Sequence, residues 1–299
     1  MNISIIIPCY NAIGKIEKCI KSLQELDFSK DLYEVIFVDD CSKDNTFEYL
    51  QEVVENEVHW SLYQLDKNSG SPSKPRNIGL THSRGEYVFF LDCDDEIISD
   101  TLKEYYQHAK KTDADIVRGY LIVDDGNKRS IHNKIHSFTG ANKKDRIHAI
   151  IKNQSTTVPS LIKRIILVHH YIQWPEEIRM GEDTLFLIQV LNISHTIEYI
   201  DHPTFIYNKK SSNQASSTQQ YGNRELLNHL KVWQEAYRLL IQNEINYLQI
   251  RLQIGLQAAL QNMMKYNSYD ISKDVFSEFT NFVNIHWKII STFNYSHRL

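Results

Sequence analysis

The sequence contains no C-x-x-C pair, and all of its cysteines fall in the first third of the chain, at Cys9, Cys19, Cys41 and Cys93. Zinc and redox sites usually show closely paired cysteines, and disulfide frameworks occur mainly in small secreted domains. Neither pattern is present. We therefore expect buried thiols in a reducing compartment, which predicts a cytoplasmic protein.

Long apolar runs are also missing. No stretch reaches the roughly 18 consecutive apolar residues from which a membrane-spanning helix is predicted. The first residues begin a strand pattern directly, without the basic segment and apolar core of a secretory signal. We expect a soluble chain, acting in the cytoplasm at large or at the inner face of the cell membrane.

Glycine and proline are scarce, with 10 and 6 among 299 residues, and 42% of the chain is apolar. This composition is typical of a globular protein and excludes fibrous or disordered classes. A chain of this length can bury a large core in one domain or two. Its net charge of −4 argues against nucleic acid as a partner, because phosphate neutralisation requires an excess of lysine and arginine.

Several common motifs are absent. The chain has no G-x-G-x-x-G after its first strand, no G-x-x-x-x-G-K-[ST] and no H-E-x-x-H. A dinucleotide fold of the usual type, a P-loop and a zinc protease are therefore not supported. No Ser-His-Asp or Cys-His pattern for nucleophilic catalysis is evident either.

The most informative stretch is an apolar run at 87–91 that ends in the carboxylates Asp92, Asp94 and Asp95. Such a run predicts a strand buried on both faces. Alternate side chains of a strand point the same way, so Asp92 and Asp94 could converge on one divalent cation. The alternative is an acidic turn that caps the helix predicted at 99–111.

Similar strands come before this one. Apolar runs at 5–7, 35–38 and 63–65 alternate with segments of helical periodicity. This alternation predicts a mainly parallel α/β sheet whose strands end at one edge. We expect a single crevice there, lined by Pro8, Asp40, Asn68 and Asp92.

A nucleotide could be held in this crevice by carboxylates. Asp40 could accept a hydrogen bond from a base N–H, while Asp92 and Asp94 hold a diphosphate through a metal ion. Arg76, in the Pro- and Ser-rich segment 68–79, could add a fixed cation beside a phosphate. The alternative for Arg76 is an ordinary exposed arginine near the start of a helix.

In the second half, residues 116–123 alternate like a strand, and the polar segment 125–157 is expected to form acceptor-side loops. Helices are predicted at 160–170 and 184–191. Asp183 would begin the second helix, where it either caps the helix or accepts a proton. A helix N-terminus favours a carboxylate by about 0.3–1 kcal/mol, which would keep Asp183 ionised.

The composition changes from Arg224 onward. Apolar residues recur every three or four positions, which predicts long amphipathic helices at 224–240 and 245–260 and a third at 274–290. Their apolar stripes could pack on the rest of the chain or on a second copy, or dock on a membrane surface. We expect a catalytic domain at 1–220 and a helical region at 221–299.

Four segments, in this order, resemble the GT-A glycosyltransferases of family 2: SIIIPCYNA at 4–12, FVDDCSKDNT at 37–46, RGEYVFFLDCDD at 84–95 and MGEDTLF at 180–186. The resemblance covers roughly the first 215 residues, about two thirds of the chain. Within the family, the segments at 68–80 and 174–186 look most like the catalytic domain of wall teichoic acid GlcNAc-transferases. The resemblance to family 2 implies the GT-A fold, which is a Rossmann-like, mainly parallel sheet flanked by helices.

The resemblance also implies a donor site. Pro8 and Tyr10 would contact the uridine of a UDP-sugar, and Asp40 would bind its uracil. Asn68 and Arg76 would face the nucleotide and its phosphates.

Asp92 and Asp94 match the family's D-x-D pair, whose second acid contacts Mn²⁺ or Mg²⁺ and whose first lies near the ribose or sugar. Asp183 matches the catalytic base. The teichoic acid enzymes carry a histidine metal ligand after the last core strand, whereas the segment 209–217 offers Gln214 here. Either Gln214 supplies an oxygen, or a water completes the metal site, or lysines of this segment bind the diphosphate instead.

The implied function is inverting transfer of a sugar, GlcNAc by the closer likeness, from a UDP-sugar to a hydroxyl of a cell-surface polysaccharide or lipid-linked glycan. Two alternatives stay open. A sugar nucleotidyltransferase would also use an α/β sheet and a metal, although CYNAIGK at 9–15 is poor in the glycine and basic residues of its usual loop. A non-catalytic scaffold module that binds the nucleotide sugar is the other.

Overall fold

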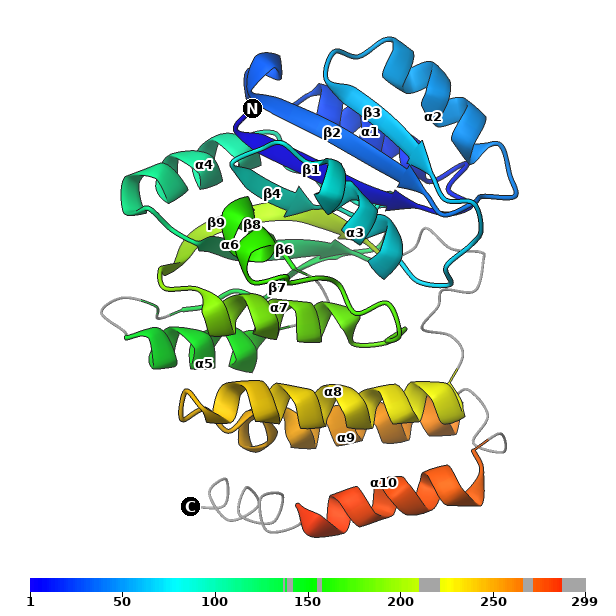
Figure 1. Ribbon diagram of the computed structural model, residues 1–299, viewed down its shortest axis with the longest axis vertical. Coiled ribbons are helices and arrows are strands. Elements are labelled where there is room, and N and C mark those ends of the chain that lie inside the picture. Colours follow the sequence, from blue (N-terminus) through cyan, green and yellow to red (C-terminus); the bar gives the residue numbers. More distant parts are fainter. Residues whose placement is uncertain (137, 139–141, 155–157, 210–220, 266–270, 287–299) are drawn as a thin grey trace.

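The computed structural model describes residues 1–136, 138, 142–154, 158–209, 221–265 and 271–286. Within this part of the chain, one sheet of nine strands carries helices on both faces. Helices α5 and α7 form a layer below the sheet in Figure 1, followed by α8 and α9 and finally by α10. The predicted α/β architecture with C-terminal helices is therefore present.

The first part of the sheet is parallel, in the order β3-β2-β1-β4. Its strands are β1 (Ile3–Cys9), β2 (Tyr33–Asp39), β3 (Trp60–Gln64) and β4 (Tyr87–Phe90). They are connected through α1 (Ile16–Gln24), η1 (Lys30–Leu32), α2 (Thr46–Glu55) and α3 (Ser73–His82). All residues of β1, β2 and β4 are buried, as expected for strands covered on both faces. Their carboxyl ends meet at one edge, as predicted.

The second part of the sheet is mixed. Strand β6 (Ile116–Asp124) runs parallel to β9 (Ile197–Asn208) and antiparallel to β7 (Arg129–His132). Strand β8 (Ser160–Lys163) lies antiparallel between β4 and β6, and β5 (Glu96–Ile97) pairs with the end of β9. The sheet is thus fully parallel among β3, β2, β1 and β4, whereas the remaining strands combine parallel and antiparallel pairs.

Two predictions in this region were wrong. The start of the helix predicted at 160–170 is strand β8, and only α6 (Arg164–His169) is helical. Leu161 and Ile162 are fully buried between neighbouring strands, and a short apolar run does not distinguish a strand from a buried helix. The segment 125–157 is not made of loops alone, because it contains β7 and α5 (Lys143–Asn153), which buries three isoleucines.

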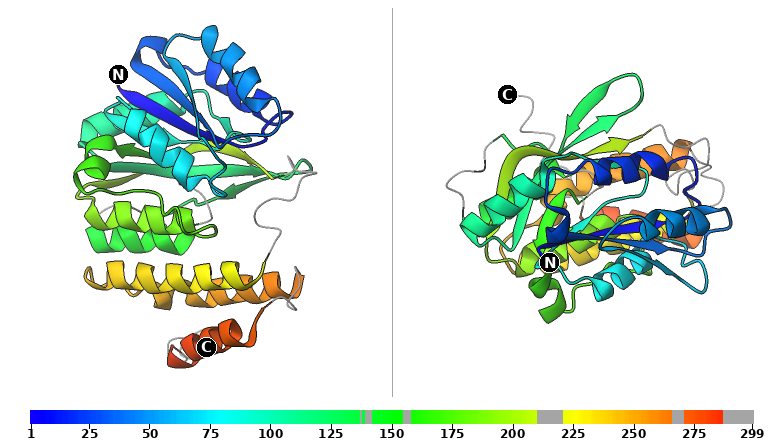
Figure 2. Two further views of the ribbon diagram at one scale, coloured as in Figure 1. Left: turned by 45° about the vertical axis from the view of Figure 1, so that its right-hand side comes forward. Right: turned by 90° about the horizontal axis from the view of Figure 1, so that it is seen from above.

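The two faces of the sheet have separate cores. Helices α1, α2 and α4 (Thr101–Thr112) cover one face, while α3, α5, α6 and α7 (Glu182–Ile193) cover the other. The second core continues into α8 (Asn223–Ile241), α9 (Tyr247–Lys265) and α10 (Lys273–Ile285), which follow as further layers in Figure 2. The amphipathic helices predicted at 224–240 and 245–260 are present as α8 and α9, and α8 packs directly on α7. The third, predicted at 274–290, is present as α10, and residues 287–290 lie outside the described part of the chain.

This continuity bears on two earlier expectations. Helix α8 packs on α7, and its Leu226 and Leu230 are buried in the core that the two helices share, while its Trp233 lies against Phe282 of α10. The division at residue 220 stays a prediction, because one apolar core crosses it. No helix in the part of the chain that the structure describes is long and apolar enough to cross a membrane.

Candidate functional site

The loop after β2 is organised by Asp40, which is 4% exposed. Its carboxylate accepts hydrogen bonds from Asn68 Nδ2 at 2.9 Å and from the backbone N and Oγ of Ser69 at 2.8 and 3.0 Å. Burial raises the pKa of Asp40, and the Ser69 bonds oppose that rise. Two predicted donor-site residues, Asp40 and Asn68, therefore form one hydrogen-bonded unit.

Pro8 and Tyr10 lie at the neighbouring strand end. Pro8 pairs with β2 within the sheet, and Tyr10 follows β1 with 42% of its surface exposed. Asn11 ties this loop to the next one, since its Oδ1 accepts from the backbone N of Lys43 at 2.8 Å. The exposed Tyr10 ring is therefore available to lie against a planar base.

Arg76 is buried on α3 in a cluster of carboxylates. Its Nη2 lies 2.6 Å from Asp92 Oδ1, and its Nη1 lies 3.8 Å from Glu182 Oε1. Burial opposes the charged form, but Asp92 and Glu182 outweigh it and raise the pKa of Arg76. The exposed-arginine alternative is excluded, because Arg76 is 6% exposed. Nε and Nη1 have no hydrogen-bond partner among the described residues.

An aromatic stack supports this guanidinium. Arg76 lies 4.1 Å from the centroid of the Trp174 ring, and Phe186 of α7 stacks on Trp174 at 4.1 Å with an interplanar angle of 8°. Asn77, next to Arg76, donates to the Trp174 carbonyl at 2.9 Å and accepts from the Trp174 amide at 2.8 Å. Sequence analysis gave Trp174 and Asn77 no role. The available signal was their position inside the two segments that resemble the teichoic acid enzymes.

Asp183 is the second residue of α7, whose N-cap is Gly181. One carboxylate oxygen accepts from the Thr184 amide at 2.7 Å, which leaves Oδ2 for another partner. Burial, followed by the charge of Glu182, raises the pKa of Asp183 well above its usual range. The helix N-terminus favours the ionised form of Asp183, and burial opposes it. A raised pKa makes the ionised carboxylate a stronger proton acceptor.

Gly181 fixes the start of α7, which makes Gly181→Ala a sensitive substitution. The φ angle is +89°, and an added Cβ would lie 3.1 Å from Val232 Cγ2 of α8. We expect a loss of about 1–2 kcal/mol in unfolding free energy from the left-handed backbone, with a further loss from the Val232 contact. Urea unfolding would measure it. Gly14→Ala is the control, since φ is +79° there with no atom within 4 Å, and an equal loss in both variants would show that Val232 contributes nothing.

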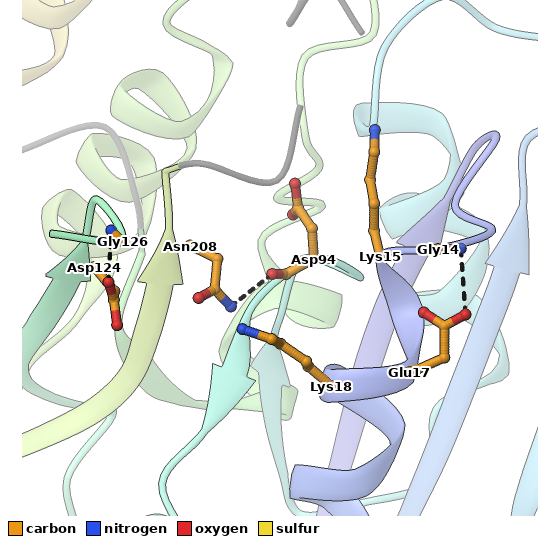
Figure 3. Close-up of a pocket in the computed structure, with 8 residues that line it drawn as sticks. All are labelled: Gly14, Lys15, Glu17, Lys18, Asp94, Asp124, Gly126 and Asn208. Atoms are coloured by element: carbon orange, nitrogen blue, oxygen red, sulfur yellow. Dashed lines mark hydrogen bonds between the residues drawn. The ribbon is translucent and has the colours of Figure 1, made fainter. Parts of the chain in front are cut away.

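The D-x-D turn is held by the end of β9. Asn208 donates from its backbone N to Asp95 Oδ1 at 3.0 Å and from Nδ2 to the Asp94 carbonyl at 2.9 Å, and Figure 3 shows the Asp94 carboxylate pointing away from that amide. The turn does not cap α4, whose N-cap is Asp100. The alternative of a simple acidic cap is therefore excluded.

A cavity of about 380 Å³ opens beside Asp94, between the start of α1 and the β6–β7 turn. It is lined only by polar residues and glycine: Gly14, Lys15, Glu17, Lys18, Asp94, Asp124, Gly126 and Asn208. Such a lining suits a ligand rich in hydroxyl or phosphate groups.

The D-x-D acids fit a hard divalent cation by their chemistry. Burial, and then the charges of Asp92 and Asp94, raise the pKa of Asp95 well above its usual range, and its buried Oδ2 has no hydrogen-bond partner among the described residues. A cation would relieve this negative potential, and carboxylate oxygens are the ligands that Mg²⁺ and Mn²⁺ prefer. Within the described ranges, no group of three or more acid, histidine or cysteine side chains is arranged to hold a metal ion. Gln214 lies outside those ranges.

Residues 4–170 match the protein-family model described as Glycosyl transferase family 2. The poly(ribitol-phosphate) beta-N-acetylglucosaminyltransferase TarS of Staphylococcus aureus strain Mu50 is 31% identical over 219 residues, which are 73% of this chain and 37% of TarS. The corresponding enzyme TarP of S. aureus strain N315 is 30% identical over 243 residues, which are 79% of this chain and 72% of TarP.

A crystal structure of S. aureus TarS 1–349 in complex with UDP-GlcNAc has the same fold, with a TM-score of 0.64 at 23% identity over 88% of this chain and 80% of that one. The chain thus spans little more than a third of full-length TarS, at 37%. The expected GT-A fold is confirmed, and so is the resemblance drawn from the sequence. The chain belongs to glycosyltransferase family 2.

Proposed function

We propose that this protein is an inverting glycosyltransferase that moves a sugar from a UDP-sugar to a hydroxyl group. The observation that carries the proposal is the cluster of Asp183, Glu182, Arg76 and Asp92, which the fold assembles at the carboxyl edge of the sheet. It combines a proton acceptor with a cation beside the predicted diphosphate position. Family membership and the UDP-GlcNAc bound in the TarS crystal structure support this assignment.

The chemistry is a single displacement. The free carboxylate oxygen of Asp183 takes the proton of the acceptor hydroxyl as that oxygen forms a bond to the anomeric carbon. The bond from the anomeric carbon to the diphosphate oxygen breaks on the opposite face, and its electron pair leaves with UDP. One displacement inverts the configuration at that carbon, and no enzyme nucleophile is required.

The donor is held by the strand ends. Asp40 and Tyr10 would bind the uracil, with Pro8 and Asn68 beside them, and Arg76 would face the phosphates. Its buried guanidinium keeps its charge there. A Mn²⁺ or Mg²⁺ on Asp94, with Asp92 nearby and Gln214 as a further proposed ligand, would neutralise charge on the departing UDP.

GlcNAc is the proposed sugar, and a cell-surface polysaccharide such as a teichoic acid, or a lipid-linked glycan, is the proposed acceptor. The named GlcNAc-transferase relatives support both. We further propose that residues 1–220 carry the chemistry on the cytoplasmic side of the membrane. Self-association or membrane contact would involve α8, α9 and α10.

Release of UDP from a panel of UDP-sugars, with Mn²⁺ and with chelator, tests the proposal. Native protein and Asp31→Ala, an exposed control in η1 ahead of β2, should turn over one donor with metal, whereas Asp94→Ala should lose the metal-dependent rate. Pyrophosphate release from UTP and a sugar phosphate would instead indicate a nucleotidyltransferase. Tight UDP binding without any turnover, even with acceptor fractions, would indicate the scaffold module.

A further inference from the structure

Helix α8 contacts the segment that leads into Asp183. Asn228, which is 8% exposed, accepts a hydrogen bond through Oδ1 from the backbone N of Arg179 at 2.9 Å. One turn further along α8, the methyl groups of Val232 lie against Gly181. Both contacts reach the chain within four residues of Asp183.

The other end of this segment is held from the catalytic side. The side chain of Asn77 in α3 accepts a hydrogen bond from the Trp174 amide and donates one to the Trp174 carbonyl. Trp174 in turn lies between the Arg76 guanidinium and the Phe186 ring. Residues 174–181 are therefore fixed at one end by the donor-site helix α3 and at the other end by α8.

This arrangement links the C-terminal helices to the geometry of the site. Gly181 is the N-cap of α7, so its position sets the first turn of that helix and the direction of the Asp183 carboxylate. The residues that face this turn from α8 are uncharged at the two contact points, and the charged pair between Lys231 and Glu177 lies outside on the surface. From the side of α8, packing and one directed hydrogen bond thus hold this turn in place.

We propose that Asn228 is a positioning residue for Asp183, and that α8 contributes to catalysis by holding the segment that leads into Asp183. This inference rests on the proposed role of Asp183 as the base. A displacement of about 1 Å of a reacting group can lower a rate about 100-fold, so a single lost bond at this turn has a measurable consequence.

The test compares Asn228→Leu, which keeps the bulk but removes the acceptor, with Asn228→Asp, which keeps an oxygen in the same place. Gln234→Ala, at an exposed position of the same helix, is the control. We expect Asn228→Leu to lower kcat about 10- to 100-fold with an unchanged KM for the donor and an unchanged Kd for UDP. Asn228→Asp should recover most of that loss, and the control should behave as native.

Amide hydrogen exchange supplies a second readout that needs no activity. In Asn228→Leu the backbone of 176–183 should exchange faster, while that of β2 stays unchanged. Unchanged kcat and exchange in Asn228→Leu would overturn the inference, as would a parallel loss of UDP binding and kcat, which indicates a purely structural role. If the native protein releases no UDP from any donor, the proposed function fails. Hydrogen exchange still tests the contact in that case, because native-like exchange of 176–183 in Asn228→Leu would show that Asn228 does not hold this segment.

Discussion

Asp183→Asn is expected to bind the UDP-sugar as the native protein does and to turn over about 10²- to 10⁴-fold more slowly. The asparagine side chain can still accept the hydrogen bond from the Thr184 amide, so the start of α7 should be preserved. What it cannot do is take a proton from an acceptor hydroxyl. Steady-state UDP release measures the rate, and calorimetry with UDP measures the binding.

A matched control is available in the same fold. Asp115 is also buried and accepts from two backbone amides, those of His195 and Thr196, at the other end of the sheet. Asp115→Asn should therefore report the cost of changing a buried, amide-bound carboxylate without touching the site. Full turnover in Asp183→Asn would refute its assignment as the base.

The same assignment has a pH signature. Burial and the charge of Glu182 raise the pKa of Asp183, so the residue is protonated over a wider acidic range than an ordinary aspartate, whose pKa is about 3.9. Only the ionised form can accept a proton. We therefore expect kcat/KM to fall as pH is lowered, with a midpoint well above that value, and we expect the fall to disappear in the residual activity of Asp183→Asn.

The strand ends could be predicted because their signal is local. Runs such as 35–38 and 87–91 are apolar throughout and stop at acids, so both the buried strands and the acidic edge followed from neighbouring residues. The strand at 160–163 could not be predicted in this way. Its identity depends on a position between two other strands, which no short apolar run encodes.

The same holds for the site. Asp92, Arg76 and Asp183 could each be predicted as site residues, but the ion pair of Arg76 with Asp92 and its burial beside Glu182 could not. Trp174 and Asn228 support the site only through contacts made after folding. The burial of Asp183, which raises its pKa, could not be predicted either, because a position in a helix can be read from neighbouring residues and burial cannot.

Arg76→Met is expected to destabilise the protein by about 3 kcal/mol and to reduce turnover strongly. Methionine can still pack on Trp174, but it removes the only positive charge that the structure pairs with Asp92 and Glu182 among the residues it describes. Breaking a fully buried pair costs about 3–5 kcal/mol, because the remaining carboxylates lose their counter-charge. The lower end applies here, because the Asp92 side chain is 37% exposed and solvent screens it. Arg238→Met, which breaks an exposed pair with Glu235, should cost less than about 1 kcal/mol.

The pH dependence of that loss distinguishes charge from packing. Arg76 lowers the pKa of Glu182 and Asp183, so its removal should raise both further above their unfolded values. A buried acid with a raised folded pKa destabilises the fold when it is ionised, and this effect vanishes below the unfolded pKa of about 4. Denaturant unfolding should therefore show the full loss at pH 7 and a smaller one near pH 4. A loss of equal size at both pH values would assign it to packing on Trp174, and Arg76 would then matter for its shape more than for its charge.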